Sequence, residues 1–220
     1  MVTMTAKLHY YQATGRGNAI RLALAAANIE FEDVFASFPP SKEQRETWRK
    51  LGGNTTTNVP MLELDDGRVY TQSSAVLLVV ARMGGLMPNN EELYLTDKLL
   101  ADAEDLRGES YKCFIPWGAS QEAADKFINE VLPLHLGNLE RQLKLSNGAY
   151  FIGDALTIAD IACYDATVNF GSSRVPGALD SFPLLKAWVA KVEENTGIKK
   201  YLASESFAGL MKFGPETVGR

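Results

Sequence analysis

Hydrophobic and polar residues follow two periods in the first part of the chain. Residues 7–11 have the pattern of a strand, and residues 18–27, rich in Ala and Leu, have that of a helix. A second strand is expected at residues 31–35, after the break at Asn28-Ile29. These segments predict a strand–helix–strand unit.

Two short strands are predicted around the turn Asp65-Asp66-Gly67, from MLEL before it and RVY after it. The apolar segment AVLLVVARM then predicts a helix that ends at Gly84-Gly85. The polar residues 37–58, ahead of this hairpin, are expected to form a long loop. This order of elements predicts a small sheet covered by helices.

The pattern changes after residue 85. Residues 86–92 contain Pro88 and paired Asn and Glu residues, which is typical of a linker. Apolar residues then recur every three or four positions in four segments: residues 93–114, 122–145, 158–170 and 183–195. The sequence therefore predicts an α/β domain at residues 1–85 and an all-α helical-bundle domain at residues 86–220.

One predicted helix has a distinct start, in the segment LTIADI at residues 156–161. Thr157 can cap the backbone N–H of Asp160, and the Asp160 carboxylate can accept the N–H of Thr157 in return. Asp160 can also be read as an acid–base group. Because every neighbour fits the capping role, we expect it to act in folding.

Composition narrows the function. The chain of 220 residues is 46% hydrophobic, which is ample for a packed core, and its net charge of -5, without a long basic run, argues against nucleic acids and anionic membranes as partners. There is no stretch of 18 apolar residues and no signal-peptide layout at the N-terminus, so we expect a soluble, cytoplasmic protein.

The two cysteines, Cys113 and Cys163, are far apart and form no Cys-x-x-Cys motif, which argues against a disulfide framework or a redox dithiol. We expect both to be small buried apolar residues. His9 and His135 form no ligand set with their neighbours, so no metal is expected. A thiol that takes part in the chemistry would have to come from a ligand.

Three segments stand in a fixed order along the chain: LHYYQATGRGNAIRLALAAANIEFEDV, then NVPMLELDDG followed by QSSAVLLVVA, then GDALTIADI. Together they resemble the cytosolic glutathione transferases of the tyrosine-dependent type, the alpha, mu, pi and sigma group. The resemblance runs in register across nearly the whole chain. It implies a thioredoxin-like glutathione-binding domain, an all-helical domain that carries the second substrate, a homodimer, and a role in detoxification.

Glutathione is then the co-substrate. Its thiol has a pKa of about 8.5, so only a few per cent is the nucleophilic thiolate at neutral pH. The resemblance implies that Tyr10 donates a hydrogen bond to this sulfur and that Arg16 supports the thiolate. The residues alone favour Tyr10 as a core residue and allow Arg16 as a solvated turn residue; the resemblance reverses the reading of Tyr10. Tyr11 competes with Tyr10, because adjacent strand residues face opposite sides of a sheet.

The resemblance also assigns residues that bind glutathione. Val59, before a cis Pro60, would pair with the cysteinyl unit as an added strand does, and Gln72-Ser73 would bind the γ-glutamyl carboxylate at a helix N-terminus. The simpler readings are that Pro60 starts an edge strand and that Ser73 caps the helix.

The glycyl carboxylate needs donors from the loop before Asn58, itself a binding residue. The resemblance points to Trp48 and Lys50, with Arg49 as the alternative to Lys50. Asn58 is mu-like, whereas the tyrosine and arginine are alpha- or sigma-like, so the subclass stays open. Asp102, in an acidic run that is otherwise typical of a solvated helix face, is implied to reach across the dimer to the γ-glutamyl amine.

The second substrate, a small hydrophobic electrophile, is expected where the helical domain faces Tyr10. Its pocket is assigned only as a group of apolar and aromatic residues: Tyr111, Phe114, Ile115, Met211 and Phe213. The predicted activity is attack of a Tyr10-stabilised glutathione thiolate on this electrophile. The alternatives are a glutathione-dependent isomerase resembling the prostaglandin synthases, and a structural protein resembling lens crystallins.

Overall fold

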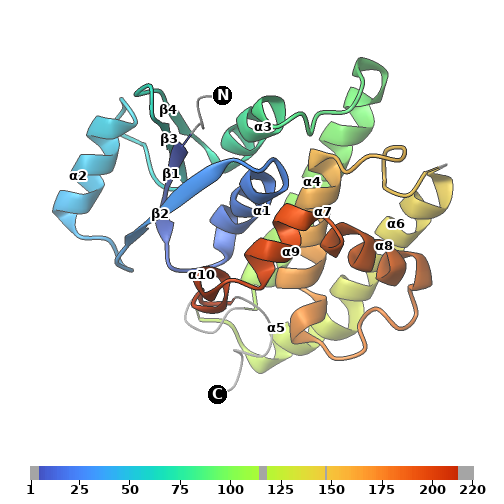
Figure 1. Ribbon diagram of the computed structural model, residues 1–220. Helices are drawn as coiled ribbons and strands as arrows, with labels where there is room; N and C mark the ends of the chain where they lie inside the picture. The colour runs from blue at the N-terminus through green and yellow to red at the C-terminus, as the bar shows by residue number, and fades with distance from the viewer. Residues whose placement is uncertain (1–4, 114–117, 147, 213–220) are drawn as a thin grey trace. The chain divides into compact units, whose positions relative to one another are not determined.

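The computed structural model describes residues 5–113, 118–146 and 148–212 (Figure 1). The chain divides into two compact units. Of the described residues, the first unit comprises 5–87 and 196–211, and the second comprises 88–113, 118–146, 148–195 and 212.

The first unit is built on a mixed sheet. Its strands are β1 (Thr5–Tyr11), β2 (Glu30–Ala36), β3 (Met61–Leu64) and β4 (Val69–Thr71), in the spatial order β2-β1-β3-β4. β1 and β2 are parallel, whereas β3 is antiparallel to both β1 and β4. The predicted strand–helix–strand unit followed by a hairpin is therefore confirmed.

Two helices, α1 (Asn18–Ala26) and α3 (Ser73–Met83), lie together on one face of the sheet (Figure 1). Leu8 of β1 and Leu62 of β3 are fully buried in the sheet, and nearly every residue of α1 is buried. A 3₁₀ turn at Gly15–Gly17 leads directly into α1. This helical layer holds the apolar core of the unit and fixes the end of β1.

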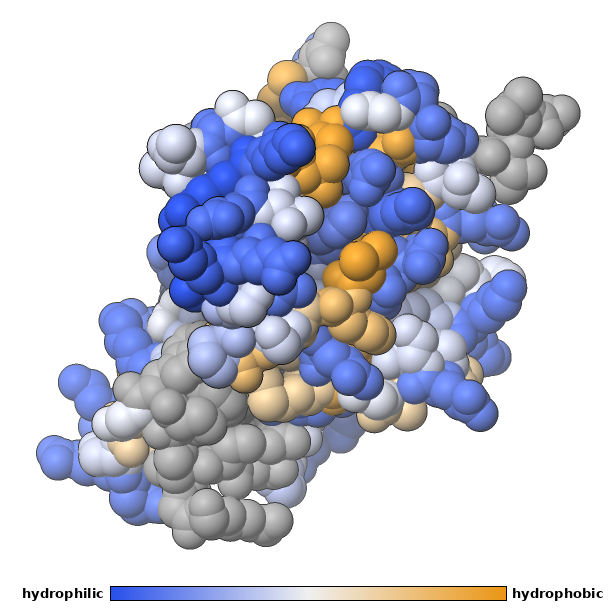
Figure 2. Space-filling model, turned by 90° about the vertical axis from the view of Figure 1, so that its left-hand side faces the viewer, coloured by the Kyte–Doolittle hydropathy of each residue, from blue (hydrophilic) through white to orange (hydrophobic). Residues whose placement is uncertain are grey.

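The third helix, α2 (Lys42–Leu51), lies on the other side of the sheet (Figure 1). The expectation of a loop over residues 37–58 is wrong here. Ser41 caps the helix by accepting the N–H of Gln44 at 3.0 Å, and Trp48 is its one buried residue. Because the sequence KEQRETWRKL has no apolar stripe, its hydrophobic pattern does not reveal a helix. Figure 2 shows this side of the molecule as mainly hydrophilic, with separate hydrophobic patches.

Residues Thr196–Met211, near the end of the described chain, also belong to the first unit. It forms α9 (Thr196–Leu202) and the short α10 (Glu205–Ala208), and α9 packs against α1. Beyond α10, Met211 pairs with Ala13 in an isolated parallel bridge.

The second unit is helical, and its described residues contain no strand, which confirms the predicted class. Its helices are α4 (Leu93–Tyr111), α5 (Gln121–Lys126), α6 (Leu132–Leu145), α7 (Ile158–Tyr164) and α8 (Pro183–Glu193), with 3₁₀ turns at Asn90–Glu92 and Ser172–Arg174. π-helical segments, Phe127–Val131 and Asp165–Asn169, interrupt the helices predicted at residues 122–145 and 158–170.

The predicted capping box of α7 is present. One oxygen of the Asp160 carboxylate accepts the N–H and hydroxyl of Thr157, and the other accepts the N–H of Phe151 and the indole N–H of Trp188. Asp160 is fully buried. Its bonds all go to structural donors of the unit, so Asp160 has a folding role, as predicted.

Candidate functional site

A cavity of about 230 Å³ in the first unit gathers many of the predicted site residues. Arg16 comes from the turn before α1. The other lining residues come from the segment before β3 and from the end of β4 and the start of α3. The predicted residues that line the cavity are Arg16, Asn58, Val59, Pro60, Gln72 and Ser73. The lining residues that the sequence did not point to are Asn54, Thr57 and Thr71.

The segment before β3, residues 57–60, lines the cavity and carries the backbone groups assigned to a peptide ligand. The Val59–Pro60 bond is cis, in agreement with the resemblance. The N–H of Val59 donates to Oδ1 of Asn58 at 2.9 Å, so the group that an extended ligand would use is held by the neighbouring side chain. The Thr57 hydroxyl is buried and has no hydrogen-bond partner among the described residues.

The start of α3 forms the opposite wall. Gln72, the residue before the helix, has a φ of 70°, a left-handed conformation that is uncommon for a residue other than glycine. No side chain caps the helix, and its first turn contains no acidic residue. The positive end of the helix dipole at the cavity suits a carboxylate.

Tyr10 is the second-last residue of β1, and its side chain is packed inside the unit, 7% exposed. The ring lies against Gly15 and Gly17: a Cβ added to Gly15 would lie 2.4 Å from the Tyr10 hydroxyl, and one added to Gly17 would lie 2.5 Å from Cδ1. The Tyr10 hydroxyl oxygen accepts the backbone N–H of Arg16 at 2.8 Å. The two glycines therefore let the Arg16 backbone approach the phenol, while the Arg16 side chain lines the cavity.

Tyr11 lies against Tyr10, with ring centroids 5.3 Å apart, but it is less buried and has further aromatic neighbours. Its ring makes edge contacts with Phe38, at a centroid distance of 5.2 Å, and with Trp48 of α2, at 6.0 Å. Burial raises the pKa of Tyr11 above its ordinary value, and the nearby charge of Arg45 opposes the shift. A phenol in this setting stays protonated and packs α2 onto the sheet.

This packing bears on the residues assigned to the glycyl carboxylate. Trp48 is 4% exposed within the aromatic cluster and is not part of the cavity lining. Lys50 and Arg49 are exposed on the last turn of α2 and are not part of that lining either. The structure thus brings together the residues predicted for the cysteinyl backbone and the γ-glutamyl carboxylate, but not these three, and Tyr10 is not among the lining residues either.

Arg21, which the sequence analysis missed, fastens the loop that follows β1. Its fully buried guanidinium donates to Asp33 Oδ1 at 2.7 Å, to the carbonyl of Ala13 at 2.9 Å and to that of Tyr11 at 3.3 Å. The signal was an arginine within the otherwise apolar helix AIRLALAA, since a buried charge requires partners.

The remaining predicted residues lie apart from this cavity's lining. Asp102, half-buried on α4, is paired with Lys98 one turn earlier, whereas Asp105 on the next turn is exposed. Tyr111, at the end of α4, makes an edge contact with Phe170 at 5.5 Å. Met211, in the first unit, is 48% exposed. Three predicted pocket residues lie outside the described residues: Phe114, Ile115 and Phe213.

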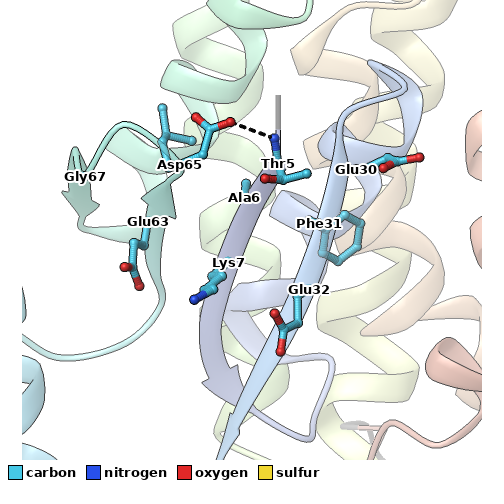
Figure 3. A pocket seen from close by; sticks show the side chains of 10 residues that line it. Thr5, Ala6, Lys7, Glu30, Phe31, Glu32, Glu63, Asp65 and Gly67 are labelled. Carbon is cyan, nitrogen blue, oxygen red and sulfur yellow. Dashed lines mark hydrogen bonds between the residues drawn. The ribbon is translucent and has the colours of Figure 1, made fainter. Parts of the chain in front are cut away.

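A larger cavity of about 590 Å³ lies around the Thr5 end of β1 (Figure 3). Its single lysine is Lys7, and the N–H of Thr5 donates to Asp65 at 3.4 Å along one edge. The carboxylates in its lining are Glu30, Glu32, Glu63 and Asp65. Four carboxylates against one ammonium disfavour a ligand such as glutathione, which carries two carboxylates. In the smaller cavity, by contrast, the one charged residue among the described lining is Arg16.

Comparisons with known proteins identify the family of this chain. Residues 6–82 match the family model described as Glutathione S-transferase, N-terminal domain, and residues 104–205 match Glutathione S-transferase, C-terminal domain. Glutathione S-transferase 1 of Ascaris suum is 30% identical over 204 residues, which are 90% of this chain and 95% of that protein. The chain belongs to the glutathione S-transferase family.

Other relatives match a similar share of this transferase. Glutathione S-transferase alpha-4 of Rattus norvegicus is 31% identical over 204 residues, which are 89% of this chain and 87% of that protein. The solved structure of a pi-class glutathione S-transferase of Onchocerca volvulus has a TM-score of 0.76 and 24% identity, covering 93% of this chain and 95% of that one. The likeness to the Onchocerca volvulus structure shows that both units have the family's fold, including the thioredoxin-like arrangement of the first unit.

Neither a membrane span nor a metal cluster is found in the part of the chain that the structure describes. None of its helices is both long and apolar enough to cross a bilayer. No group of three or more His, Cys, Asp or Glu side chains there is arranged to hold a metal ion. Cys113 and Cys163 are both buried free thiols, as predicted.

Proposed function

We propose that this glutathione S-transferase binds glutathione in the 230 Å³ cavity and that Tyr10 holds the bound sulfur as a thiolate, which attacks a small hydrophobic electrophile. Family membership makes the chain a glutathione-dependent enzyme. The assignment of Tyr10 rests on one observation above all. Its hydroxyl oxygen accepts the N–H of Arg16 at 2.8 Å, and Arg16 is also a wall of the cavity.

Tyr10 and Arg16 can supply the free energy needed to lower the pKa of the bound glutathione thiol. Lowering a thiol pKa by about two units needs about 2.7 kcal/mol of preference for the anion. A hydrogen bond to a charged group contributes about 1.5–3 kcal/mol. The phenol oxygen of Tyr10 accepts an N–H, which polarises its O–H as a donor to sulfur. The guanidinium of Arg16 adds positive charge at the cavity wall.

The chemical step follows from the thiolate. Its lone pair forms a C–S bond with the electrophilic carbon. In a displacement the bond to the leaving group breaks and the leaving group departs with its electron pair; in an addition the electrons move onto the acceptor, which takes a proton from solvent. Tyr10 keeps its own proton throughout, because its role is to stabilise the anion that reacts.

The cavity walls supply the groups that orient glutathione. The γ-glutamyl carboxylate binds at Gln72-Ser73, where the first N–H groups of α3 outnumber what one hydroxyl can satisfy. The cysteinyl unit pairs with Val59 by strand addition, once Asn58 releases the Val59 N–H. The glycyl carboxylate is assigned to Lys50 or Arg49, which lie outside the cavity lining on α2, and Trp48 supports α2 from within its aromatic cluster.

We extend the proposal to a homodimer that acts in the cytoplasm, which is typical of the family. In the dimer the γ-glutamyl amine is bound by an acid on α4 of the second copy. The sequence assignment is the partner subunit's Asp102. The ion pair between Asp102 and Lys98 makes the exposed Asp105 a rival. Tyr111 and Met211 remain the proposed contacts of the electrophile.

The direct test is conjugation of glutathione to chlorodinitrobenzene by the purified protein, with Tyr10→Phe and Tyr11→Phe measured beside it. We expect the rate to collapse in Tyr10→Phe and to persist in Tyr11→Phe, because the Tyr11 ring that packs in the aromatic cluster is kept in phenylalanine. Equal loss in both variants would contradict the assignment. A parent protein that binds glutathione by calorimetry but conjugates nothing would favour the isomerase or the structural protein.

A further inference from the structure

The loop at residues 12–14, which follows β1, is hydrogen-bonded to residues 209–211 at the C-terminal end of the first unit. The N–H of Met211 donates to the carbonyl of Gln12 at 3.0 Å, and the N–H of Thr14 donates to the carbonyl of Met211 at 2.9 Å. These two backbone bonds form the parallel bridge between Ala13 and Met211. They join residues almost 200 positions apart, because the paired positions differ by 197 for Thr14 and Met211.

Side chains reinforce the same attachment. The Thr14 hydroxyl donates to the Met211 carbonyl at 3.3 Å, and the Gln12 amide donates to the Gly209 carbonyl at 3.3 Å. Thr14 is fully buried, and Leu210, between the two acceptors, is 4% exposed. Leu210 is therefore packed into the unit, and its exposed neighbours Gly209 and Met211 are held to it by hydrogen bonds.

A second attachment lies on the other side of the Gly15–Gly17 turn. The hydroxyl of Tyr201 in α9 donates to Oδ1 of Asn18 at 2.8 Å, and the N–H of Asn18 donates to the carbonyl of Thr14 at 2.9 Å. The Tyr201 ring also packs edge-on against Phe207 of α10, at 5.2 Å. The C-terminal segment thus holds the chain both before and after the turn that carries Arg16.

The position of that turn matters for the chemistry. Tyr10 meets the turn through the Arg16 N–H, and the clearance between its ring and Gly17 leaves no room for even one added methyl group. A shift of residues 12–14 displaces the Arg16 N–H relative to the phenol oxygen. Since hydrogen bonds weaken steeply as their geometry departs from linear, the displacement weakens the polarisation of the Tyr10 hydroxyl.

We propose that residues 209–211 form a C-terminal clamp that positions the Tyr10–Arg16 pair and thereby sets the pKa of the bound glutathione thiol. Gln12, Thr14 and the backbone of Met211 are positioning groups, since they act through Arg16 and not on the substrate. Arg21 holds the same loop from the core side through the carbonyls of Tyr11 and Ala13. The inference rests on the proposed role of Tyr10. It adds that residues 209–211 fix the position from which Tyr10 and Arg16 act.

The test uses the full chain with Met211→Pro, which removes the N–H donated to Gln12, and Met211→Ala as the matched control, which keeps both backbone bonds. The pH dependence of thiolate absorbance gives the pKa of bound glutathione. We expect Met211→Pro to raise it by about one unit, which corresponds to an about tenfold loss of kcat/KM at neutral pH. Met211→Ala should keep the parent's thiol pKa and alter only the KM for the electrophile.

A second variant tests the clamp if Met211→Pro does not fold. The double change Gln12→Met with Thr14→Val removes both side-chain bonds and leaves the backbone bridge, and a smaller rise of the thiol pKa is expected. A thiol pKa equal to the parent's in a folded Met211→Pro protein, or in the double variant if the proline variant is unfolded, would overturn the clamp. An equal rise in Met211→Ala would overturn it too.

Tyr10→Phe, measured in the same series, separates this inference from the proposed function. If Tyr10→Phe raises the thiol pKa and the clamp variants do not, the clamp fails and the catalytic role stands. If Tyr10→Phe leaves the thiol pKa unchanged, the role of Tyr10 fails, and the clamp fails with it.

Discussion

Gly17→Ala is a small substitution that should displace the Tyr10 ring. The added Cβ would lie 2.5 Å from Tyr10 Cδ1 and 2.9 Å from Cγ, whereas ordinary van der Waals contact begins at 3.4 Å. The ring therefore has to move by about 1 Å, a misplacement that can reduce a rate by about 100-fold. Overpacking of this kind also costs about 1–3 kcal/mol of stability.

The assay is conjugation of glutathione to chlorodinitrobenzene, together with glutathione binding by calorimetry and unfolding in urea. We expect kcat/KM to fall by about 100-fold while glutathione affinity changes little, because Gly17 does not line the cavity. The matched control is Gly108→Ala in α4, where nothing lies within 4 Å of the added Cβ. This control should keep its activity and gain about 0.5–1 kcal/mol of stability. A folded Gly17→Ala protein with the parent's kcat/KM would refute the packing argument for Tyr10.

Three further predictions concern other parts of the chain. Arg21→Met leaves the Asp33 carboxylate without its buried partner and should cost about 3–5 kcal/mol in urea unfolding; a loss near zero would show that the pair is dispensable. Burial raises the pKa of the Cys113 thiol from 9.0 to about 11. Native Cys113 should therefore resist alkylation near neutral pH, and its stabilising contribution, full below its ordinary pKa, should be lost as pH rises through about 11; rapid alkylation of the native protein would contradict this. For the γ-glutamyl amine, Asp105→Asn should raise the KM for glutathione by about tenfold and Asp102→Asn by less, because Asp102 must first release Lys98, and the reverse order would favour Asp102.

Much of the sheet and of the cavity was predictable because the signals are local. The Asp65-Asp66-Gly67 turn sets the β3–β4 hairpin, and the Val59-Pro60 and Gln72-Ser73 pairs stand at the ends of elements whose order follows from the pattern. The period of a strand predicts different burial for Tyr10 and Tyr11. Tyr10 is buried and Tyr11 is half-buried, although their rings lie 5.3 Å apart.

The remaining features depend on contacts that no short segment encodes. α2 buries only Trp48, so its sequence has no periodic stripe. The partners of Arg21 come from β2 and from the loop after β1, and its burial appears only when these elements meet. The return of residues 209–211 to the loop at residues 12–14 joins opposite ends of the chain. Apolar periodicity likewise gives no sign of the π-helical interruptions in the second unit.

The most direct test of the account is the pKa of the glutathione thiol bound to the parent protein and to Tyr10→Phe, measured from thiolate absorbance against pH. The account predicts that the parent lowers this pKa by about two units from its free value of about 8.5, and that Tyr10→Phe returns it most of the way. A thiol that titrates near its free value in the parent, or equally low in both proteins, would contradict the claim that Tyr10 creates the nucleophile.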